Sequence, residues 1–250
     1  MDKQYQITAS IVLFNQDKNI LKTTIDSFLK TNLKKRLYLI DNGNKSSLKT
    51  EFNHPEIEYI LNNKNIGFGK AHNLVLNKIN SDFHLILNPD VVFNKDVLPK
   101  LILKLKSQKK TSFISPKVLY PNKRLQYICR KHPTFFDLLN RKLKISKNRI
   151  FENEYRNLNY NKSFYPEFIH GCFMLFKTKD FIDLKGFDER YFLYMEDADI
   201  CKKIDNLGNN KLYFPEVEVI HVLKKGSSKS INLFFKHTYS AIKYFLKWGF

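Results

Sequence analysis

Apolar and polar residues alternate along the first half of the chain in blocks that predict strands and helices in turn. Four short apolar runs are typical of buried strands: Ile7–Phe14, Leu37–Ile40, Ile57–Leu61 and Phe83–Leu87. Three segments between or after them carry apolar residues at helical spacing: Asn19–Leu29, Ala71–Ile79 and Val97–Leu105. Strands that alternate with helices predict βαβ units, and therefore an α/β fold with a mostly parallel sheet.

The second half of the chain is less regular. Lys117–Tyr120 and Arg124–Ile128 flank a Pro-Asn-Lys turn, which predicts a hairpin. Further on, the pattern predicts one helix, Glu196–Leu207, and three strands, Phe168–Phe176, Leu212–Phe214 and Val217–Ile220. The basic and aromatic segment Lys131–Tyr165 has no clean period, so a helical insert and a mobile loop both stay open for it.

Polar residues follow each of the first four predicted strands. They are Asn15, Asp41-Asn42, Asn62–Asn65 and Asn88-Pro89-Asp90. Each of these polar strand ends, taken alone, could equally be an ordinary turn, because turns also favour polar residues. In open parallel sheets, however, ligands bind outside the carboxyl ends of the strands. Together the four stops therefore predict one polar cleft at that edge of the sheet.

Composition narrows the classes of protein that fit this pattern. The 250 residues suit one large α/β domain or two small ones, and the net charge of +19 favours a polyanionic partner: nucleic acid, an anionic lipid surface or a phosphate-bearing substrate. The three cysteines fit no metal-knuckle or disulfide framework. The first residues lack the layout of a signal peptide, and no apolar run approaches the roughly 20 residues that span a bilayer. We therefore expect a cytoplasmic protein, soluble or peripheral to a membrane.

Several stretches match, in order, those of one enzyme family. They are SIVLFN (10–15), IDNGN (40–44), NKNIGFGKAHN (63–73), LNPDV (87–91), HGCFMLFK (170–177), GFDERYFLYMEDADIC (186–201), YFP (213–215) and IHVLKKGSS (220–228). With them the sequence resembles the family 2 inverting glycosyltransferases, and most of all their rhamnosyltransferase-like branch. The resemblance covers about residues 7–228. It implies a Rossmann-like GT-A fold and transfer of a sugar from a nucleotide diphosphate donor.

The resemblance also implies a divalent cation, Mn²⁺ or Mg²⁺, that bridges the two donor phosphates. The family takes its carboxylate ligand from an Asp-X-Asp motif, which here reads Asn88-Pro89-Asp90. Asp90 is then the implied metal ligand, and Asn88 would contact phosphate, ribose or a metal-bound water. His221 is the implied second ligand, and a structural histidine at a strand end is its alternative.

Donor recognition is implied by the same resemblance. Asp41 would accept the N3–H of a pyrimidine, which selects uracil or thymine, with Phe14 and Asn15 beside the base. The remaining implied nucleotide contacts are Asn65, Gly67, Lys70 and Asn73, of which Lys70 would meet phosphate. The donor is then a dTDP- or UDP-sugar, and the branch favours rhamnose.

Inverting transfer needs one general base. The resemblance draws it from Glu196-Asp197, at the start of a predicted helix, with Asp197 the preferred base and Glu196 the second choice. Capping of that helix is the alternative role for both carboxylates. His170 and Gly171 match the acceptor-side strand of the family. His170 would touch the donor sugar or acceptor, unless it is a buried structural histidine.

The C-terminal segment Ile231–Phe250 reads as a basic amphipathic helix, with a polar stripe at Lys236, Ser240, Lys243 and Lys247. It fits either an interfacial membrane helix or a helix packed on the catalytic domain. We therefore predict a GT-A domain over 1–228 and this helix over 229–250, with the nucleotide-binding half at about 1–115 and the acceptor half at about 116–228. The partners expected are the donor, a glycan or lipid-linked glycan acceptor, and the inner face of an anionic membrane.

Two other functions stay open from the sequence. The positive charge, the 13 Tyr and the 22 Phe would suit a basic nucleic-acid-binding protein. No nucleic-acid-binding motif is recognisable, however, and we do not expect nucleic acid as a partner. Asn88 stands where the family's motif has its first Asp, which keeps a catalytically silent glycosyltransferase-like subunit as the other alternative.

Overall fold

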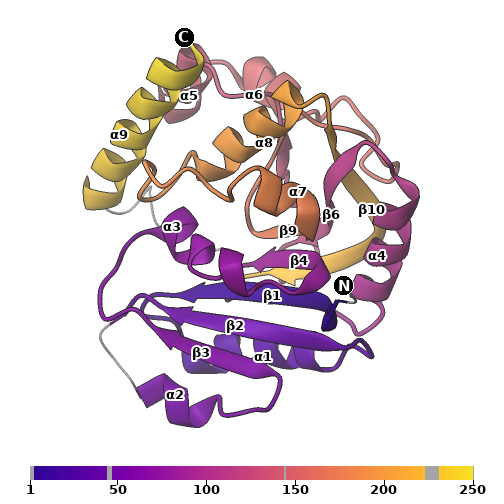
Figure 1. Cartoon of the computed structure of the whole chain (residues 1–250). Helices are drawn as coiled ribbons and strands as arrows, with labels where there is room; N and C mark the ends of the chain where they lie inside the picture. Colours follow the sequence, from indigo (N-terminus) through magenta and orange to yellow (C-terminus); the bar gives the residue numbers. More distant parts are fainter. Residues whose placement is uncertain (1–2, 44–46, 144, 223–230, 250) are drawn as a thin grey trace.

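The computed structural model of the chain describes residues 3–43, 47–143, 145–222 and 231–249. Eight strands of these residues form one curled sheet in the order β3-β2-β1-β4-β9-β6-β10-β5 (Figure 1). The parallel half contains β1 (Tyr5–Leu13), β2 (Lys35–Asp41), β3 (Ile57–Leu61) and β4 (Ser81–Leu87). The other half contains β5 (Val91–Val92), β6 (Thr111–Leu119), β9 (Phe173–Lys177) and β10 (Asn210–His221).

Two strands of the second half run against their neighbours. β9 is antiparallel to both β4 and β6, and β5 is antiparallel to β10, whereas β6 and β10 are parallel. The short strands β7 (Cys129–Arg130) and β8 (Phe168–Ile169) form a separate antiparallel pair. The prediction of a mostly parallel α/β sheet is therefore confirmed.

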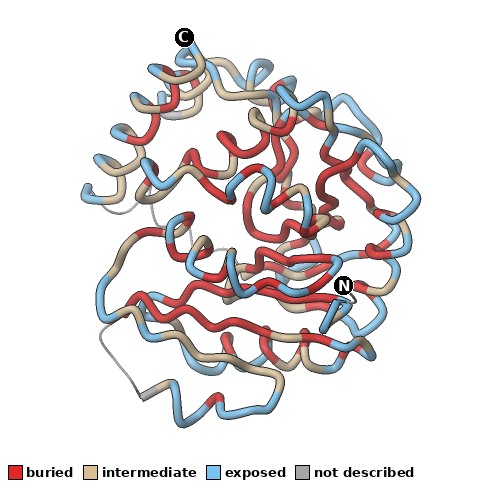
Figure 2. The backbone as a smooth tube through the Cα atoms, in the orientation of Figure 1, coloured by how far each residue is buried: buried red, intermediate tan, exposed pale blue. Residues whose placement is uncertain are grey.

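Helices cover both faces of the sheet (Figure 1). They are α1 (Lys18–Leu29), α2 (Ser47–Glu51), α3 (Phe68–Asn73), the 3₁₀ turn η1 (Leu76–Lys78), α4 (Val97–Ser107), α5 (Phe135–Leu143), α6 (Lys147–Asn153), α7 (Thr178–Asp183), α8 (Glu196–Asn206) and α9 (Ile231–Trp248). Burial is continuous through the central strands, and β1 is buried at each of its last seven residues (Figure 2). The apolar runs that predicted the strands therefore form the core between the helical layers.

Local signals explain where the elements begin. Asp17 caps α1, because its carboxylate accepts hydrogen bonds from the backbone N–H groups of Asn19 (2.9 Å) and Ile20 (3.2 Å). The same helix buries Leu21, Ile25 and Phe28 at helical spacing. The segment 131–165, left open between helix and loop, contains the two helices α5 and α6.

Four predicted elements were wrong in their bounds. The strand predicted over Phe168–Phe176 is interrupted at 170–172 and forms β8 and β9, because this stretch turns towards α8. The two strands predicted between 212 and 220 form one strand, β10, with an irregular register between Phe214 and Glu218. The expected hairpin at 117–128 forms but is short: Leu119 and Leu125 form an antiparallel bridge, and the N–H groups of Tyr120 and Gln126 donate to the carbonyls of Arg124 (2.8 Å) and Val118 (2.9 Å).

The fourth is the helix predicted over 71–79. It begins earlier, as α3, and ends at Asn73, whose side chain bonds the backbone of Phe187 instead of continuing the helix. Helix α7 was not predicted.

Helix α9 packs on the domain by its polar stripe. Ser240 donates to the carbonyl of Leu193 (2.9 Å), Lys243 donates to the carbonyl of Arg190 (2.7 Å), and Lys236 lies over the ring of Phe192. Near the end of the helix, Lys247 bonds Asp188 (2.8 Å) and Asp199 (2.7 Å). The polar residues that would normally face water therefore face protein.

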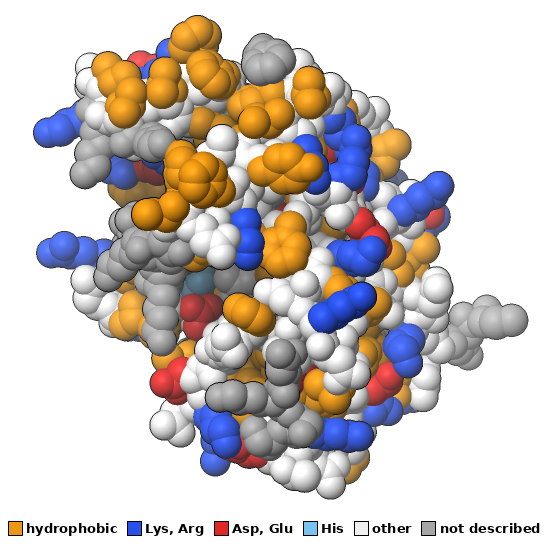
Figure 3. Space-filling view, turned by 90° about the vertical axis from the view of Figure 1, so that its left-hand side faces the viewer, with side chains coloured by type: hydrophobic (Ala, Val, Ile, Leu, Met, Phe, Trp, Pro, Cys, Tyr) orange, Lys and Arg blue, Asp and Glu red, His pale blue; other side chains and the backbone are white. Residues whose placement is uncertain are grey.

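The opposite side of α9 exposes apolar residues at steps of three and four. We call it the outer stripe, and it consists of Ile231, Phe235, Tyr239, Ile242 and Leu246. Figure 3 views this side of the molecule and shows apolar side chains gathered over its upper part, where α9 lies. Within the described residues, none of the helices is long and apolar enough to cross a membrane.

Candidate active site

A pocket of about 600 Å³ opens at the carboxyl ends of the central strands, between α3, α5, α6, α8 and α9. We call it the cleft. Its floor includes Asn88, His170, Gly171, Glu196 and Asp197. These residues are distant in sequence and were predicted as site residues, so the fold brings five of them to one place.

Asp90 and His221 form a pair next to the cleft. The Oδ1 atom of Asp90 lies 3.3 Å from Nε2 of His221, and the amide nitrogen of Asn88 lies 3.5 Å from the same Nε2. Pairing of β5 with β10 explains this contact, because it sets Val91 opposite His221. His221 is almost completely buried, whereas Asp90 keeps part of its surface exposed.

Gln126 fixes the tautomer of His221. The amide nitrogen of Gln126 donates to the His221 carbonyl (2.8 Å), so its oxygen faces Nδ1 at 3.0 Å and accepts a hydrogen bond from it. A neutral His221 then carries its proton on Nδ1 and turns the lone pair of Nε2 towards Asp90. A ring nitrogen held in this way is typical of metal-ligating histidines.

The electrostatics of this pair favour a cation. Burial alone lowers the pKa of His221, but Cys172 and the Asp90 carboxylate raise it to about 10. Burial likewise raises the pKa of the Cys172 thiol, but His221 and His170 lower it to about 6. One carboxylate and one imidazole suit Mn²⁺ better than Mg²⁺. Among the described residues, no group of three or more His, Cys, Asp or Glu side chains is arranged to hold a metal ion, so other ligands would complete its shell.

Glu196 and Asp197 begin α8 in different surroundings. Asp197 accepts a hydrogen bond from the backbone N–H of Gly171 (3.0 Å) and another from Ala198 (2.9 Å). Glu196 is only 5% exposed, and its Oε2 has no hydrogen-bond partner among the described residues. Burial, together with the charge of Asp197, raises the pKa of Glu196 to about 8. The pair therefore offers one hydrogen-bonded carboxylate and one carboxyl group that is neutral at pH 7.

The predicted base-reading residues lie at the ends of β1 and β2. Asp41 is buried and accepts hydrogen bonds from the Tyr59 hydroxyl and from the backbone of Gly43 (2.7 Å). Phe14 is exposed, and Asn15 has a positive φ of 54°. Since each carboxylate oxygen has two lone pairs, Asp41 can still accept a further proton donor.

The segment Asn65–Gly67 joins the nucleotide side to the GFDERYFLYMEDADIC stretch. Asn65 accepts from the Gly67 N–H (3.0 Å), and Asn42 donates to the Gly67 carbonyl (2.9 Å). Gly67 has φ +94°, and a Cβ there would lie 2.2 Å from the carbonyl oxygen of Phe192. Only glycine therefore fits this close approach.

Lys70 and Asn73, both predicted to contact nucleotide, make contacts within the protein. Lys70 forms an exposed ion pair with Glu189 (2.8 Å). Asn73 makes two hydrogen bonds with the backbone of Phe187, at 2.8 and 2.9 Å. These contacts hold α3 against the stretch that precedes α8, so they position the cleft wall.

A continuous series of contacts links the predicted residues. From Asp41 it runs through its neighbour Asn42 to Gly67, and two residues further on a Cβ on Gly69 would lie 3.5 Å from the Glu196 Cβ, so this backbone passes close to Glu196. Asp197 then bonds Gly171, and the carbonyl of Cys172 accepts from the N–H of Asn88, which contacts His221. The predicted site is therefore one connected rim.

The sequence analysis missed several residues of the cleft. Arg130, on β7, and Arg141, on α5, both line it, and neither belongs to a matched stretch. Gln126 and Cys172, which contact His221 next to the cleft, were also missed. The cysteine directly after His170-Gly171 was the only sequence signal among the four.

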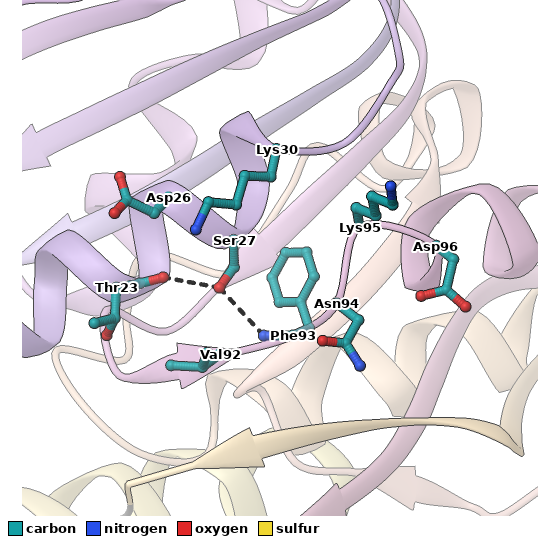
Figure 4. A pocket seen from close by; sticks show the side chains of 9 residues that line it. All are labelled: Thr23, Asp26, Ser27, Lys30, Val92, Phe93, Asn94, Lys95 and Asp96. Atoms are coloured by element: carbon teal, nitrogen blue, oxygen red, sulfur yellow. Dashed lines mark hydrogen bonds between the residues drawn. The ribbon is translucent and has the colours of Figure 1, made fainter.

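A second pocket, of about 680 Å³, lies between α1 and the segment 92–96 (Figure 4). Ser27 joins its two sides, because its hydroxyl donates to the Thr23 carbonyl (2.8 Å) and accepts from the Phe93 N–H (3.3 Å). None of its lining side chains belongs to the predicted site, so the chemistry is sought in the cleft.

Solved structures with a similar fold are glycosyltransferases. One is described as the crystal structure of GalNAc-T7 with UDP, GalNAc and Mn²⁺, with a TM-score of 0.69, 15% identity, and coverage of 88% of this chain and 44% of that one. Another is the mannosyltransferase PcManGT from Pyrobaculum calidifontis in complex with GDP-Man and Mn²⁺, with a TM-score of 0.63, 16% identity, and coverage of 89% and 58%. The fold is therefore of the GT-A type, as predicted.

The family follows from the sequence comparison. A model described as glycosyl transferase family 2 matches residues 8–184, and the chain belongs to this family. It is 29% identical over 171 residues to the rhamnosyltransferase WbbL of Escherichia coli, covering 62% of this chain and 60% of the relative. It is 23% identical over 185 residues to an N-acetylglucosaminyl-diphospho-decaprenol L-rhamnosyltransferase of Mycobacterium tuberculosis, covering 67% and 59%. The chain thus spans about 60% of the length of these relatives.

Proposed function

We propose that the protein is a metal-dependent inverting glycosyltransferase that takes a sugar, with rhamnose favoured, from a dTDP- or UDP-sugar donor. The observation that carries the proposal is that the Asp90–His221 pair contacts Asn88 at the edge of the cleft that Asp197 also lines. The names of the two relatives support rhamnose.

Asp90 and His221 hold the divalent cation in this proposal, and Asn88 helps to orient the donor beside them. The bound cation supplies positive charge that stabilises the leaving nucleotide diphosphate. Asp41 accepts the N3–H of the pyrimidine base, with Phe14 and Asn15 beside it. Asn65 and Gly67 shape the loop that this base approaches.

Asp197 acts as the general base. Its carboxylate, held by the Gly171 N–H, takes the proton of an acceptor hydroxyl. The hydroxyl oxygen attacks the anomeric carbon from the face opposite the phosphate, and the sugar–phosphate bond breaks with its electrons going to the phosphate. Because the neighbouring Glu196 is neutral, it places no second negative charge next to the base. His170 contributes to the sugar-binding surface.

The acceptor is a glycan carried on a lipid, and the protein reaches it at an anionic membrane surface. The outer stripe of α9 supports this part, because five exposed apolar side chains follow one helix face. α5 packs next to α9, since Phe135 contacts the buried Phe245 with ring centroids 6.4 Å apart, and it adds the exposed apolar side chains of Phe136 and Leu143. Apolar contact together with a net charge of +19 suits the interface of an anionic bilayer.

Ligand-dependent stability tests the enzyme assignment. With Mn²⁺ present, saturating dTDP or UDP sugars should raise the unfolding free energy by about 2 to 4 kcal/mol, and DNA or RNA should not. Asp90→Ala should weaken this metal-dependent binding, whereas Asp197→Asn should keep it and abolish transfer. Stabilisation by nucleic acid alone would contradict the proposal. If the protein binds nucleotide sugars but transfers no sugar to any acceptor, it is a catalytically silent glycosyltransferase-like subunit instead.

Vesicle sedimentation tests the membrane contact. The double variant Phe235→Ser and Leu246→Ser should bind anionic phosphatidylglycerol vesicles at least tenfold more weakly than the unchanged protein. Leu103→Ser is the matched control, since Leu103 is equally exposed but lies on α4. Equal binding by the double variant and the unchanged protein would remove α9 from the membrane contact.

A further inference from the structure

Two arginines lie in the cleft that Asp197 lines. Arg130 comes from β7 and Arg141 from α5, and both side chains line the cleft together with Asp197. The charge of Asp197 acts on Arg130. None of the roles proposed above uses either guanidinium.

Among the described residues, neither arginine has an ion pair that it does not share with another arginine. Both reach towards Glu154, but the ion pairs span 3.6 Å for Arg130 and 3.7 Å for Arg141, longer than a hydrogen bond. Glu154 is already bonded by Arg156, through two hydrogen bonds of 2.8 and 2.6 Å. Three guanidinium groups therefore share one buried carboxylate, and the surplus positive charge faces the cleft.

One buried donor of these two arginines is unpaired within the described part of the chain. The Nε of Arg130 is buried and has no hydrogen-bond partner among the described residues. Two of the other acidic side chains that line the cleft are already bonded: Asp137 bonds Arg149 (2.6 Å) and Thr134 (2.7 Å), and Asp197 accepts from the backbone N–H groups of Gly171 and Ala198. Because unpaired buried donors are costly, such a site gains most from an anion that enters with several oxygens.

The two guanidinium groups also repel each other. Burial, followed by the charge of Arg130, lowers the pKa of Arg141 to about 10, and burial lowers the pKa of Arg130. A bound anion would relieve both effects. The planar fork of arginine matches the oxygens of a phosphate group in pairs, so phosphate fits this site better than a single-atom anion.

We propose that Arg130 and Arg141 form a subsite for the phosphate or diphosphate of the acceptor, so that the cleft takes a sugar linked to a phosphorylated lipid. This rests on the proposed function and adds the group that is recognised. The subsite lies beside the base, so a phosphate bound there holds the acceptor sugar with its hydroxyl near Asp197.

The position of α5 supports an acceptor rather than the donor as the source of this phosphate. Leu138 and Arg141 line the cleft, whereas Phe136 and Leu143 of the same helix are exposed. One helix thus offers a charged inner side for a phosphate and an apolar outer side for a lipid chain. The donor diphosphate has its own cation-binding pair at Asp90 and His221.

Anion binding without metal is the first test. With EDTA present, inorganic pyrophosphate should raise the melting temperature of the unchanged protein, and Arg141→Gln should weaken its apparent affinity about tenfold or more. Arg149→Gln is the matched control, because it removes a nearby arginine that does not line the cleft. Asp90→Ala should keep the effect. Equal stabilisation of the unchanged protein and Arg141→Gln would overturn the proposal, and Arg130→Gln gives a second variant in case the first does not fold.

Kinetics is the second test and separates the sources of the phosphate. Arg141→Gln should raise KM for a short-chain prenyl-diphosphate sugar about tenfold or more, and leave unchanged both the donor KM and kcat/KM for the methyl glycoside of the same sugar. A rise in the donor KM instead would assign the arginines to the donor and overturn the proposal. If the unchanged protein transfers no sugar at all, the proposed function fails, and the pyrophosphate measurement still decides the subsite.

Discussion

Replacement of Glu196 by glutamine tests the division of labour between the two carboxylates of the cleft. Because burial, together with the charge of Asp197, raises the pKa of Glu196 to about 8, the neutral carboxyl group predominates at pH 7. Glutamine has nearly the same shape and stays neutral. We therefore expect Glu196→Gln to transfer sugar within a few-fold of the unchanged rate at pH 7, whereas Asp197→Asn loses about 10² to 10⁴.

The same substitution should stabilise the fold. The pKa of Glu196 is raised from its ordinary value of 4.5, so the folded state binds the extra proton between pH 4.5 and 8, and stability falls as pH rises through that window. The loss amounts to about 1.4 kcal/mol per pH unit, and to about 3 kcal/mol at pH 7. Glu196→Gln removes this dependence and should gain stability of that order at pH 7.

Urea unfolding from pH 5 to 8, with transfer rates measured at pH 7, checks both results. The difference in unfolding free energy between the variant and the unchanged protein should grow with pH and level off above pH 8. Two outcomes would refute the reasoning: a pH-independent difference, or a loss of activity by Glu196→Gln as large as that of Asp197→Asn. Either would mean that Glu196 works as an ionised group.

Three further substitutions probe the surroundings of the cleft. Gly67→Ala should destabilise by about 2 kcal/mol or more in urea unfolding and weaken nucleotide binding, because its Cβ would meet the Phe192 carbonyl at 2.2 Å with φ +94°. Lys247→Met should cost about 3 kcal/mol in the same assay, because it leaves the buried Asp199 carboxylate without its cation. His84→Gln should remove a loss of stability below pH 6.5, worth about 1.4 kcal/mol per pH unit, since burial lowers the pKa of His84 to about 3 and only the unfolded chain gains the proton.

Matched controls separate these effects from general damage. Gly208→Ala shares the positive φ but has no described atom within 4 Å, so its cost should be smaller than that of Gly67→Ala. Lys243→Met removes a lysine of the same stripe that bonds a carbonyl rather than a buried carboxylate. His54 is exposed, so His54→Gln should keep the pH dependence of the unchanged protein. Equal effects within any pair would contradict the mechanism given for it.

The strand-end part of the predicted rim could be found from sequence because its residues sit where apolar runs stop. The runs ending near Asn15, Asp41 and Asn88 became β1, β2 and β4, and their polar stops share one edge because the strands are parallel. Short-range pattern was sufficient there. Asp197 needed the motif resemblance, since an acidic first turn of a helix has an ordinary capping role as well.

Long-range contacts explain what the sequence did not reveal. From the sequence, Arg130 and Arg141 are indistinguishable from surface charges. They line the cleft only because β7 pairs with β8 and because α5 forms part of the cleft wall. Helical spacing identified both faces of α9 but did not decide which one packs inward. That depends on Asp188 and Asp199, about 50 residues earlier, which draw Lys247 towards the domain.

The contacts of Asp199 attach the last turn of α9 to α8, the helix that begins with the proposed base. Its carboxylate accepts from Lys247 and from the indole of Trp248, both at 2.7 Å, while two residues before it stands Asp197. Truncation of α9 to raise solubility would remove these two hydrogen-bond donors together with the apolar outer stripe. Shortened versions ending before Lys247 should therefore be inactive, and solubilising changes belong on the outer stripe, with the last turn left intact.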